Sequence, residues 1–248
     1  MIKRLARDLV EWPWRLMPRA VRSSLLKAGI FAAARQQARP ALIELLDLER
    51  VISGQIDLAA LEYGAGVHVK HRLMRYHDFF VDRIKPGERV LDVGCGYGAV
   101  ASSIAERSRA RVTGIDLNAA SVDQARRSHQ APGLEFVHGE APGDLKAEHF
   151  DVIVLSNVLE HINERGPFLA ALRAKATPSR LLIRVPMFDR EWRVPLRKEL
   201  GLYYFSDPTH YVEYTRETFE AEMAEAGLAI EHLQVNWGEI WAEVRPRA

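Results

Sequence analysis

The sequence predicts an α/β protein: a Rossmann-like, doubly wound sheet of seven strands that ends in a C-terminal antiparallel hairpin and is preceded by N-terminal helices. First, residues 89–98 (RVLDVGCGYG) run from an apolar strand into a glycine-rich turn. Second, four further apolar runs alternate with helical patterns up to Val185, as in sheets of parallel strands. Third, two alternating runs flank Asn236-Trp-Gly238, which predicts a closing hairpin.

Composition and length allow one full core with appendages, since the chain has 248 residues and is 48% hydrophobic. The single cysteine, Cys95, excludes an intramolecular disulfide and suits a reducing compartment. No apolar run approaches the length of a membrane span, and the N-terminus lacks the apolar core of a signal peptide. We therefore expect a cytoplasmic protein.

The first 40 residues form a strongly basic segment, with nine lysines and arginines against two acids, whereas the remainder has a net charge of −6. Tryptophans and leucines lie between the basic residues. Two interpretations follow: a helical cap on the main domain, or a peripheral contact with the inner membrane face. Pro13 and Pro18 interrupt a long amphipathic helix and favour the cap.

The N-terminal extension is expected to span residues 1–85 and to be helical. Apolar spacing predicts helices over 20–38 and 41–52, with Ser53-Gly54 ending the second and Asp57 capping a short turn. A third helix is expected over 69–84. Its histidines and arginines are typical of a solvated basic face over an anchor of Phe79 and Phe80.

The second domain is expected to span residues 86–248. Asn118 or Ser121 is predicted to cap its second helix, and Thr215 to start its last one. The expected helices cover 97–108, 118–129 and 215–226, and the expected strands cover 89–93, 111–115, 134–138, 150–155, 180–185, 228–235 and 239–244.

The glycine turn carries the first functional prediction. Gly94, Gly96 and Gly98 allow a sharp turn at the carboxyl end of the strand and a close approach to a ligand. Asp92 within the strand would repel phosphate and suits a cationic or hydroxyl-bearing ligand. Asp116 ends the second strand twenty residues after Gly96, the usual reach to a ribose-binding carboxylate. The spacing differs from the G-x-G-x-x-G of dinucleotide-binding domains.

With these residues the sequence resembles the class I S-adenosylmethionine-dependent methyltransferases over roughly residues 86–245. The resemblance implies S-adenosylmethionine as the cofactor, with Gly94 and Gly96 beneath its methionine part and Asp92 near its ammonium. It also implies that Asp116 binds both ribose hydroxyls and that Glu140 accepts from the adenine amino group, with Asp144 as the alternative. The remaining cofactor neighbours it implies are Cys95, Leu117, Ala141 and Asn157. The same resemblance implies that the helix expected over 69–84 lies beside the cofactor and substrate cleft.

The stretch after the fourth strand, 156–162 (SNVLEHI), resembles the family's LEH-(I/V) motif, in which the histidine faces the transferable methyl group. His161 is therefore the first catalytic candidate, and capping or packing beneath the loop is the structural alternative. His210 is a second candidate base. Asp207 would orient whichever histidine acts.

A metal-assisted route is a further alternative. Residues 210–216 resemble a segment of the small-RNA 2′-O-methyltransferases, whose E-x-x-E-H motif and a later histidine bind a divalent metal. The corresponding residues would be Asn157, Glu160, His161 and His210. Asparagine binds a hard cation less strongly than a carboxylate, so we expect no metal. We also expect no nucleic acid partner, because the chain after residue 40 is acidic.

A long insertion, residues 187–214, follows the fifth strand and is rich in aromatic and charged residues. It predicts a lid over the cleft that accepts a polar ring such as a sugar, with Trp237 and Trp241 bordering the site; a small subdomain packed on the sheet edge is the alternative. The expected function is O-methylation of a small polar acceptor, such as a sugar of a bacterial surface glycan or its lipid-linked precursor. The alternatives are N-methylation of an amine or amino sugar, and a non-catalytic cofactor-binding scaffold. The sequence does not predict the oligomeric state.

Overall fold

The computed structural model describes residues 13–65 and 67–247, so the first twelve residues of the basic segment, among them Lys3, Arg4, Arg7, Asp8, Glu11 and Trp12, lie outside the described residues. The chain divides into two compact units, Met1–His68 and Val69–Ala248. None of the helices in the described residues is long and apolar enough to cross a membrane.

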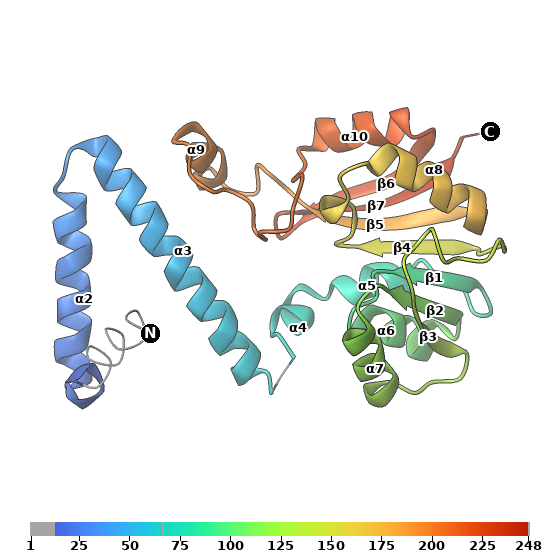
Figure 1. The fold of residues 1–248 in the computed structure, drawn as a ribbon, viewed down its shortest axis with the longest axis horizontal. Helices are drawn as coiled ribbons and strands as arrows, with labels where there is room; N and C mark the ends of the chain where they lie inside the picture. The colour runs from blue at the N-terminus through green and yellow to red at the C-terminus, as the bar shows by residue number, and fades with distance from the viewer. Residues whose placement is uncertain (1–12, 66, 248) are drawn as a thin grey trace. The chain divides into compact units, whose positions relative to one another are not determined.

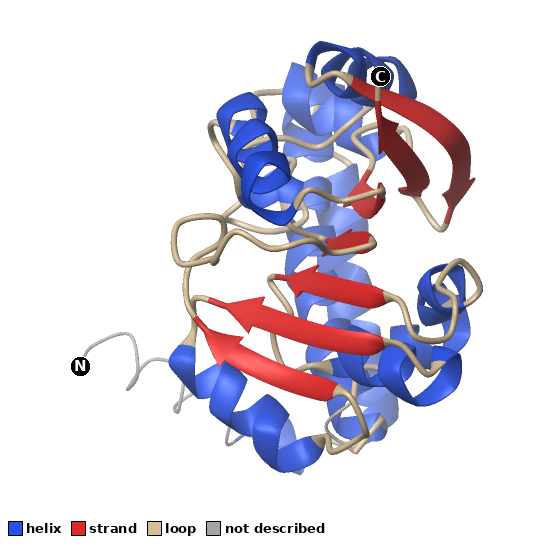
Figure 2. Cartoon of the chain, turned by 90° about the vertical axis from the view of Figure 1, so that its right-hand side faces the viewer, coloured by secondary structure: helices blue, strands red, loops and turns tan. Residues whose placement is uncertain are grey.

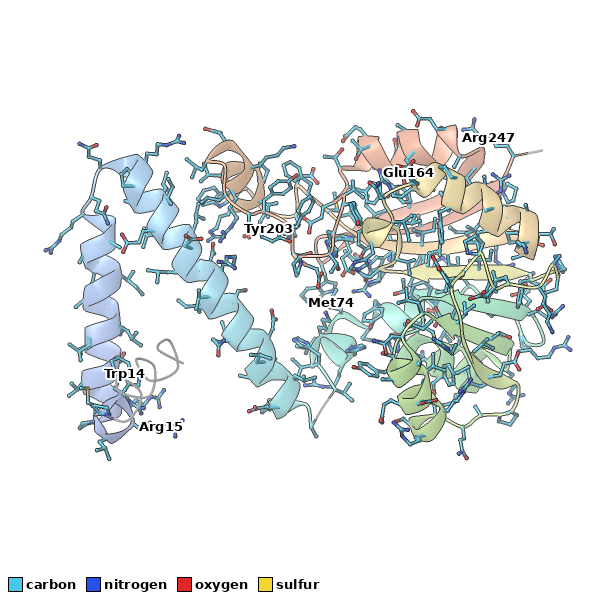
Figure 3. The ribbon with its side chains drawn as sticks, viewed as in Figure 1. Trp14, Arg15, Met74, Glu164, Tyr203 and Arg247 are labelled. Carbon is cyan, nitrogen blue, oxygen red and sulfur yellow. The ribbon has the colours of Figure 1, made fainter. Side chains whose placement is uncertain are left out.

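The described part of the first unit includes the helices α2 (Arg19–Ala34) and α3 (Ala38–Tyr63), which meet at a short turn (Figure 1). Their buried residues, Ala33, Ala41 and Leu46, all lie near this turn. Figure 3 shows the side chains along the rest of both helices.

The prediction that Ser53-Gly54 ends the second helix was wrong, as was the separate turn capped by Asp57, because α3 continues through both to Tyr63. A glycine inside a helix costs about 1 kcal/mol relative to alanine. Nine residues of α3 follow Gly54, so the helix continues to Tyr63. A single glycine is therefore not sufficient to end it.

The prediction of one continuous helix over residues 69–84 was also wrong. It consists of α4 (Lys70–Met74) and α5 (Tyr76–Val81), separated at Arg75, whose φ of 52° is left-handed. The break turns α5 so that Tyr76, Phe79 and Phe80 are buried against the sheet.

The second unit is built on a seven-stranded sheet (Figure 2), as the sequence predicts. The strand order is β3-β2-β1-β4-β5-β7-β6, as the labels in Figure 1 show. The first five strands are parallel and the last two pair antiparallel. Their bounds are β1 Arg89–Val93, β2 Arg111–Asp116, β3 Leu134–His138, β4 Val152–Ser156, β5 Arg180–Pro186, β6 Leu228–Asn236 and β7 Glu239–Pro246.

Helices cover both faces of this sheet. One core contains residues of α5, α6 (Ala99–Ser108) and α7 (Ala119–Ser128), including Ile104 and Val122. The opposite core contains residues of α8 (Arg165–Ala176) and α10 (Arg216–Glu225), including Leu172 and Phe219. The predicted caps are present: Asn118 accepts from the amide of Ser121, and Thr215 forms a capping box with Thr218.

The strand order reverses between β1 and β4, which lie side by side in parallel. In such sheets ligands bind beyond the carboxyl ends of the strands at this switch point. Here these ends lead into the glycine turn after β1 and into the short 3-10 helix η1 (Leu159–His161) after β4. The fold thus brings together the two stretches that carry the sequence motifs.

Candidate functional site

The glycine turn is shaped so that one side stays open. Gly94, Gly96 and Gly98 all have positive φ, at 66°, 53° and 82°. A Cβ on Gly94 would lie 2.9 Å from Val158 of the loop after β4, and one on Gly98 would lie 2.5 Å from Phe136, whereas one on Gly96 would meet nothing within 4 Å. A ligand can therefore approach the backbone at Gly96, which suits an extended cofactor.

Asp116 connects the glycine turn to the end of β2. Its Oδ2 accepts a hydrogen bond of 2.8 Å from the amide of Gly96, and its Oδ1 accepts one of 2.8 Å from the amide of Asn118. Two oxygens offer about four acceptor positions, so two remain for ligand hydroxyls. The carboxylate is thus fixed in place and can still accept a ribose diol.

Asp92 lies beneath the turn and is only 1% exposed. Burial, together with the nearby charge of Asp116, raises the pKa of its carboxyl to about 7, although the amide of Ala101 donates to it and acts in the opposite direction. Its Oδ2 has no hydrogen-bond partner in the described structure. A cation bound at the turn would favour the ionised form, so this residue fits a cofactor that carries an ammonium and a sulfonium.

The other predicted cofactor neighbours differ in how they could reach a ligand. The Cys95 side chain packs in the core, where burial raises the pKa of its thiol, so only its backbone can reach a ligand. Leu117 is 74% exposed just after β2, a position that offers an apolar face. The Glu140 side chain is exposed, and its amide donates to Asp144, which thereby stabilises the turn that includes Ala141.

His161 is held by a chain of hydrogen bonds from the insertion. Thr209 Oγ1 lies 2.8 Å from His161 Nδ1 and 2.6 Å from Asp207 Oδ1. An ionised carboxylate only accepts, so the threonine hydroxyl donates to Asp207 and accepts from His161 Nδ1–H. This assigns the tautomer that leaves Nε2 as the basic nitrogen. Burial and the neighbouring His210 lower the pKa of His161.

His210 has a similar arrangement. Its Nδ1 lies 3.2 Å from Oε1 of Glu213, a fully buried carboxylate that also accepts from Ser206 and pairs with Arg190. Despite burial, these hydrogen bonds lower the pKa of Glu213. The ionised Glu213 therefore fixes Nδ1–H on His210. The two imidazole rings lie edge to face with centroids 4.6 Å apart.

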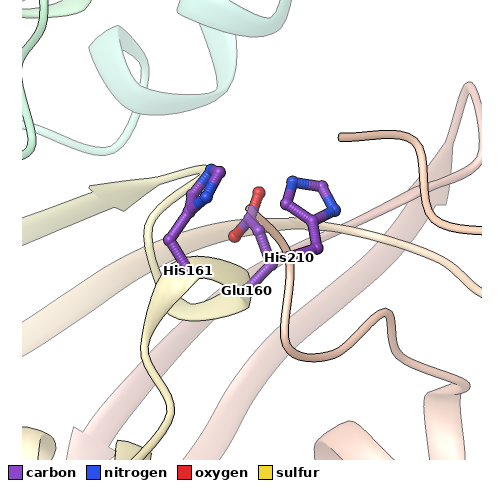
Figure 4. Close-up of side chains that lie close together, drawn as sticks. All are labelled: Glu160, His161 and His210. Atoms are coloured by element: carbon purple, nitrogen blue, oxygen red, sulfur yellow. The ribbon is translucent and has the colours of Figure 1, made fainter. Parts of the chain in front are cut away.

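Glu160 completes a cluster with the two histidines (Figure 4). Ligand atoms of Glu160, His161 and His210 lie within 4.8 Å of one another. Oε1 of Glu160 accepts from Asn157 at 2.7 Å, its Oε2 is buried without a partner, and burial raises the pKa of its carboxyl to about 7. These three residues could hold a divalent cation. Asn157 contributes a neutral amide to this environment.

The insertion closes on itself at its base, where Met187 pairs with Tyr214, and it contains the short helix α9 (Arg193–Glu199). The amide of Tyr211 donates to the carbonyl of Glu160, which joins the insertion to η1. Its exposed aromatic side chains are Trp192, Tyr203 and Tyr211. Trp237 is exposed in the β6–β7 turn. Trp241 is buried against Phe79, so the prediction that it borders the site was wrong.

Sequence reasoning missed Thr209 and Glu213, the residues that contact the two histidines. No motif marked Thr209, and the resemblance over residues 210–216 included Glu213 without giving it a role. The spacing His210-x-x-Glu213 could have suggested a local pair. Thr209 contacts a residue 48 positions away, which only the path of the insertion can establish.

Comparison with known proteins agrees with this geometry. A sequence profile described as a methyltransferase domain matches residues 65–233, more than half of the chain. The chain belongs to this methyltransferase family. It is a class I S-adenosylmethionine-dependent methyltransferase by family, and S-adenosylmethionine is its cofactor.

The methyltransferase is similar over parts of its length to curated proteins. It is 32% identical to a mitochondrial ubiquinone biosynthesis O-methyltransferase of Schizosaccharomyces pombe, over 39% of this chain and 37% of that protein. It is 42% identical to a fatty-acid O-methyltransferase of Mycolicibacterium smegmatis, over 29% and 27% of the two chains. The matched region thus spans less than half of either relative.

Solved structures share the fold at low identity. A magnesium protoporphyrin IX methyltransferase from Synechocystis, crystallised with S-adenosylhomocysteine, has a TM-score of 0.57 and 20% identity, covering 73% of this chain and 85% of that chain. A methyltransferase of Haloferax volcanii in complex with an activator has a TM-score of 0.59 and 12% identity, covering 73% and 92%. These likenesses concern the fold alone.

Proposed function

We propose that this methyltransferase acts on a hydroxyl oxygen of a small polar acceptor, namely a sugar of a bacterial surface glycan or of its lipid-linked precursor. One observation carries the proposal: Asp207 and Thr209 hold His161 in the tautomer whose Nε2 can take a proton. His161 belongs to the stretch after β4 that lies beside the glycine turn, since a Cβ on Gly94 would lie 2.9 Å from Val158 of that stretch. A hydroxyl requires such a base, whereas a neutral amine does not.

The cofactor supplies an electrophilic methyl carbon on a sulfonium. The protein would hold the acceptor hydroxyl in line with that carbon, so that the oxygen would form its new C–O bond as the C–S bond breaks and the electron pair passes to sulfur. The hydroxyl proton passes to His161 Nε2. The positive charge that develops on the imidazole is stabilised through Thr209 by the carboxylate of Asp207. S-adenosylhomocysteine and the methyl ether are the products.

Two observations support the acceptor class. The exposed aromatic side chains Trp192, Tyr203 and Tyr211 stand on the insertion that supplies Thr209 and His210. Flat apolar faces beside hydrogen-bonding groups suit a ring that carries hydroxyls. The two curated relatives described above are named as O-methyltransferases, which supports oxygen as the atom methylated.

The experiment is a transfer assay with methyl-labelled S-adenosylmethionine and a panel of sugars, lipid-linked glycans and amino sugars. We expect labelled methyl ethers on hydroxyl acceptors, and we expect His161→Ala to lower kcat about 100-fold or more. His149→Ala is the matched control, because His149 precedes β4 at the opposite end of that strand. Labelling of amines that survives in His161→Ala would support N-methylation instead. Cofactor binding without turnover on any acceptor would support the scaffold alternative.

A further inference from the structure

The α2–α3 hairpin, residues 19–63, exposes most of its large apolar side chains. Within the described structure only Ala33, Ala41 and Leu46 of the hairpin are buried. The exposed large apolar residues of the hairpin are Val21, Leu25, Leu26, Ile30, Phe31, Leu48, Val51, Ile52, Ile56, Leu58, Leu61 and Tyr63. Isolated exposed apolar residues are ordinary, but a concentration of this size marks an interaction surface.

The geometry of the hairpin explains this exposure. The two helices diverge from the turn at residues 35–37 (Figure 1), so they contact each other only near that turn. Every residue from 51 to 59 of α3 is exposed. Ile52, Ile56 and Tyr63 lie on one face at helical spacing, while Val51 and Leu58 lie on another. A helix that is apolar on several faces is stable when other helices surround it.

Charge identifies the partner. Helix α2 contains Arg19, Arg22 and Lys27 and no acid, which gives a net charge of +3 (3 − 0). Helix α3 contains five acids, Glu44, Asp47, Glu49, Asp57 and Glu62, and two arginines, which gives −3 (2 − 5). The hairpin therefore has one basic and one acidic helix, each with exposed apolar residues.

Helix α3 also has a groove that suits such a helix. Apolar side chains, among them Ile43, Leu48 and Val51, line a shallow groove whose charged members are Glu44, Asp47 and Arg50. Two acids and one arginine give the groove a net negative charge beside its apolar side chains. It is therefore complementary to a basic helix with exposed apolar residues. Helix α2 is of that kind.

We propose that this hairpin pairs with the hairpin of a second copy of the chain, forming a four-helix interface. Under a two-fold axis, α2 of one copy packs on α3 of the other, and the reverse contact forms at the same time. Opposite charges then meet twice, and the exposed apolar residues become buried. An anionic lipid surface would attract α2 but repel α3. At about 1.5 Å per residue, the 26 residues of α3 span roughly 39 Å, along which α2 of the second copy can pack.

The test is the molar mass of the full chain at micromolar concentration, measured by light scattering after gel filtration. We expect twice the chain mass of 28.1 kDa for the wild type and a single chain mass for Ile52→Lys/Ile56→Lys. Val235→Lys is the matched control, because Val235 in β6 is 48% exposed, as is Ile52. All variants should bind S-adenosylmethionine as the wild type does, which separates this result from loss of the cofactor site.

Charge reversal tests the arrangement itself. Arg19→Glu/Arg22→Glu/Lys27→Glu should give monomers, and adding Glu44→Lys/Asp47→Lys/Asp57→Lys should restore the dimer. A monomeric wild type would overturn the proposal; in that case, binding to phosphatidylserine vesicles would assign the surface to lipid. A dimer that persists in Ile52→Lys/Ile56→Lys would place the interface elsewhere and would also overturn it.

Discussion

Thr209 Oγ1 lies 2.8 Å from Nδ1 of His161, although 48 residues separate the two in sequence. The same hydroxyl donates to Asp207, so this contact connects a carboxylate of the insertion to the histidine after β4. The insertion therefore contributes to the candidate site. In the mechanism proposed above, Thr209 is a positioning residue whose role can be separated from folding.

Replacing this threonine should reduce turnover with little effect on binding. Thr209→Val removes the acceptor of His161 Nδ1–H while keeping the side-chain shape. Loss of a hydrogen bond to a group that becomes charged costs about 1.5–3 kcal/mol, so we expect kcat to fall about 10- to 100-fold with KM unchanged. Thr209→Ser retains the hydroxyl and should be close to the wild type. Equal activity of the valine and serine variants in steady-state assays would contradict the relay.

The dependence of the rate on pH should report His161. Its pKa lies below the ordinary 6.5, because burial and the nearby His210 disfavour the charged ring. The base works only when neutral, so kcat should be constant at neutral pH and fall as the pH drops through that lowered pKa. A pH–rate profile from pH 5 to 8 measures this. An acid limb centred above 6.5 would exclude His161 as the base.

Asp92→Asn should separate stability from cofactor binding. Burial raises the pKa of Asp92 from 3.8 to about 7. Between these two pH values the folded protein keeps the carboxyl proton, whereas the unfolded chain has lost it. This residue therefore lowers stability progressively as pH rises from about 4 to about 7. The neutral asparagine lacks this effect and should raise the Tm at pH 8 but not at pH 4.

The same variant should bind S-adenosylmethionine more weakly, because it lacks the negative charge beneath the turn. Calorimetry at pH 8 measures that loss. If the Tm difference between the variant and the wild type is the same at pH 4 and at pH 8, the carboxyl of Asp92 titrates with its ordinary pKa despite its burial.

Methyl transfer should persist after removal of divalent cations. Ligand atoms of Glu160, His161 and His210 lie within 4.8 Å of one another, but Asn157 stands where a further carboxylate would strengthen a cation site. We expect EDTA to leave the rate unchanged. Loss of activity with EDTA, restored by Mg²⁺ or Mn²⁺ and abolished in Glu160→Gln, would assign the cluster to metal-assisted catalysis.

The sheet was predictable because its strands are short apolar runs that end in glycine, asparagine or proline. The strand Leu134–His138 and the caps Asn118 and Thr215 match the structure residue for residue. Parallel topology then places the ends of β1 and β4 together, so the proximity of the glycine turn to the loop after β4, where Val158 lies beside Gly94, also followed from sequence.

The contacts of the insertion could not be predicted in the same way. Glu213 and Thr209 act through long-range or buried hydrogen bonds, which depend on how the insertion folds back on η1. The continuation of α3 past Gly54 had a different cause, because a local glycine signal was outweighed by the helix-forming residues around it. Charge on α2 and α3 was visible in the sequence, whereas the divergence of the two helices was not.

The most direct test of the whole account is calorimetric titration of the purified chain with S-adenosylmethionine and S-adenosylhomocysteine. We expect one site in the wild type, and no detectable binding in Asp116→Ala or in Asp116→Asn, which keeps the side-chain size. Asp123→Ala, which removes an exposed carboxylate from α7, should bind as the wild type does. Circular dichroism confirms that each variant is folded. Failure of the wild type to bind either ligand, or full binding by both Asp116 variants, would contradict the site described here.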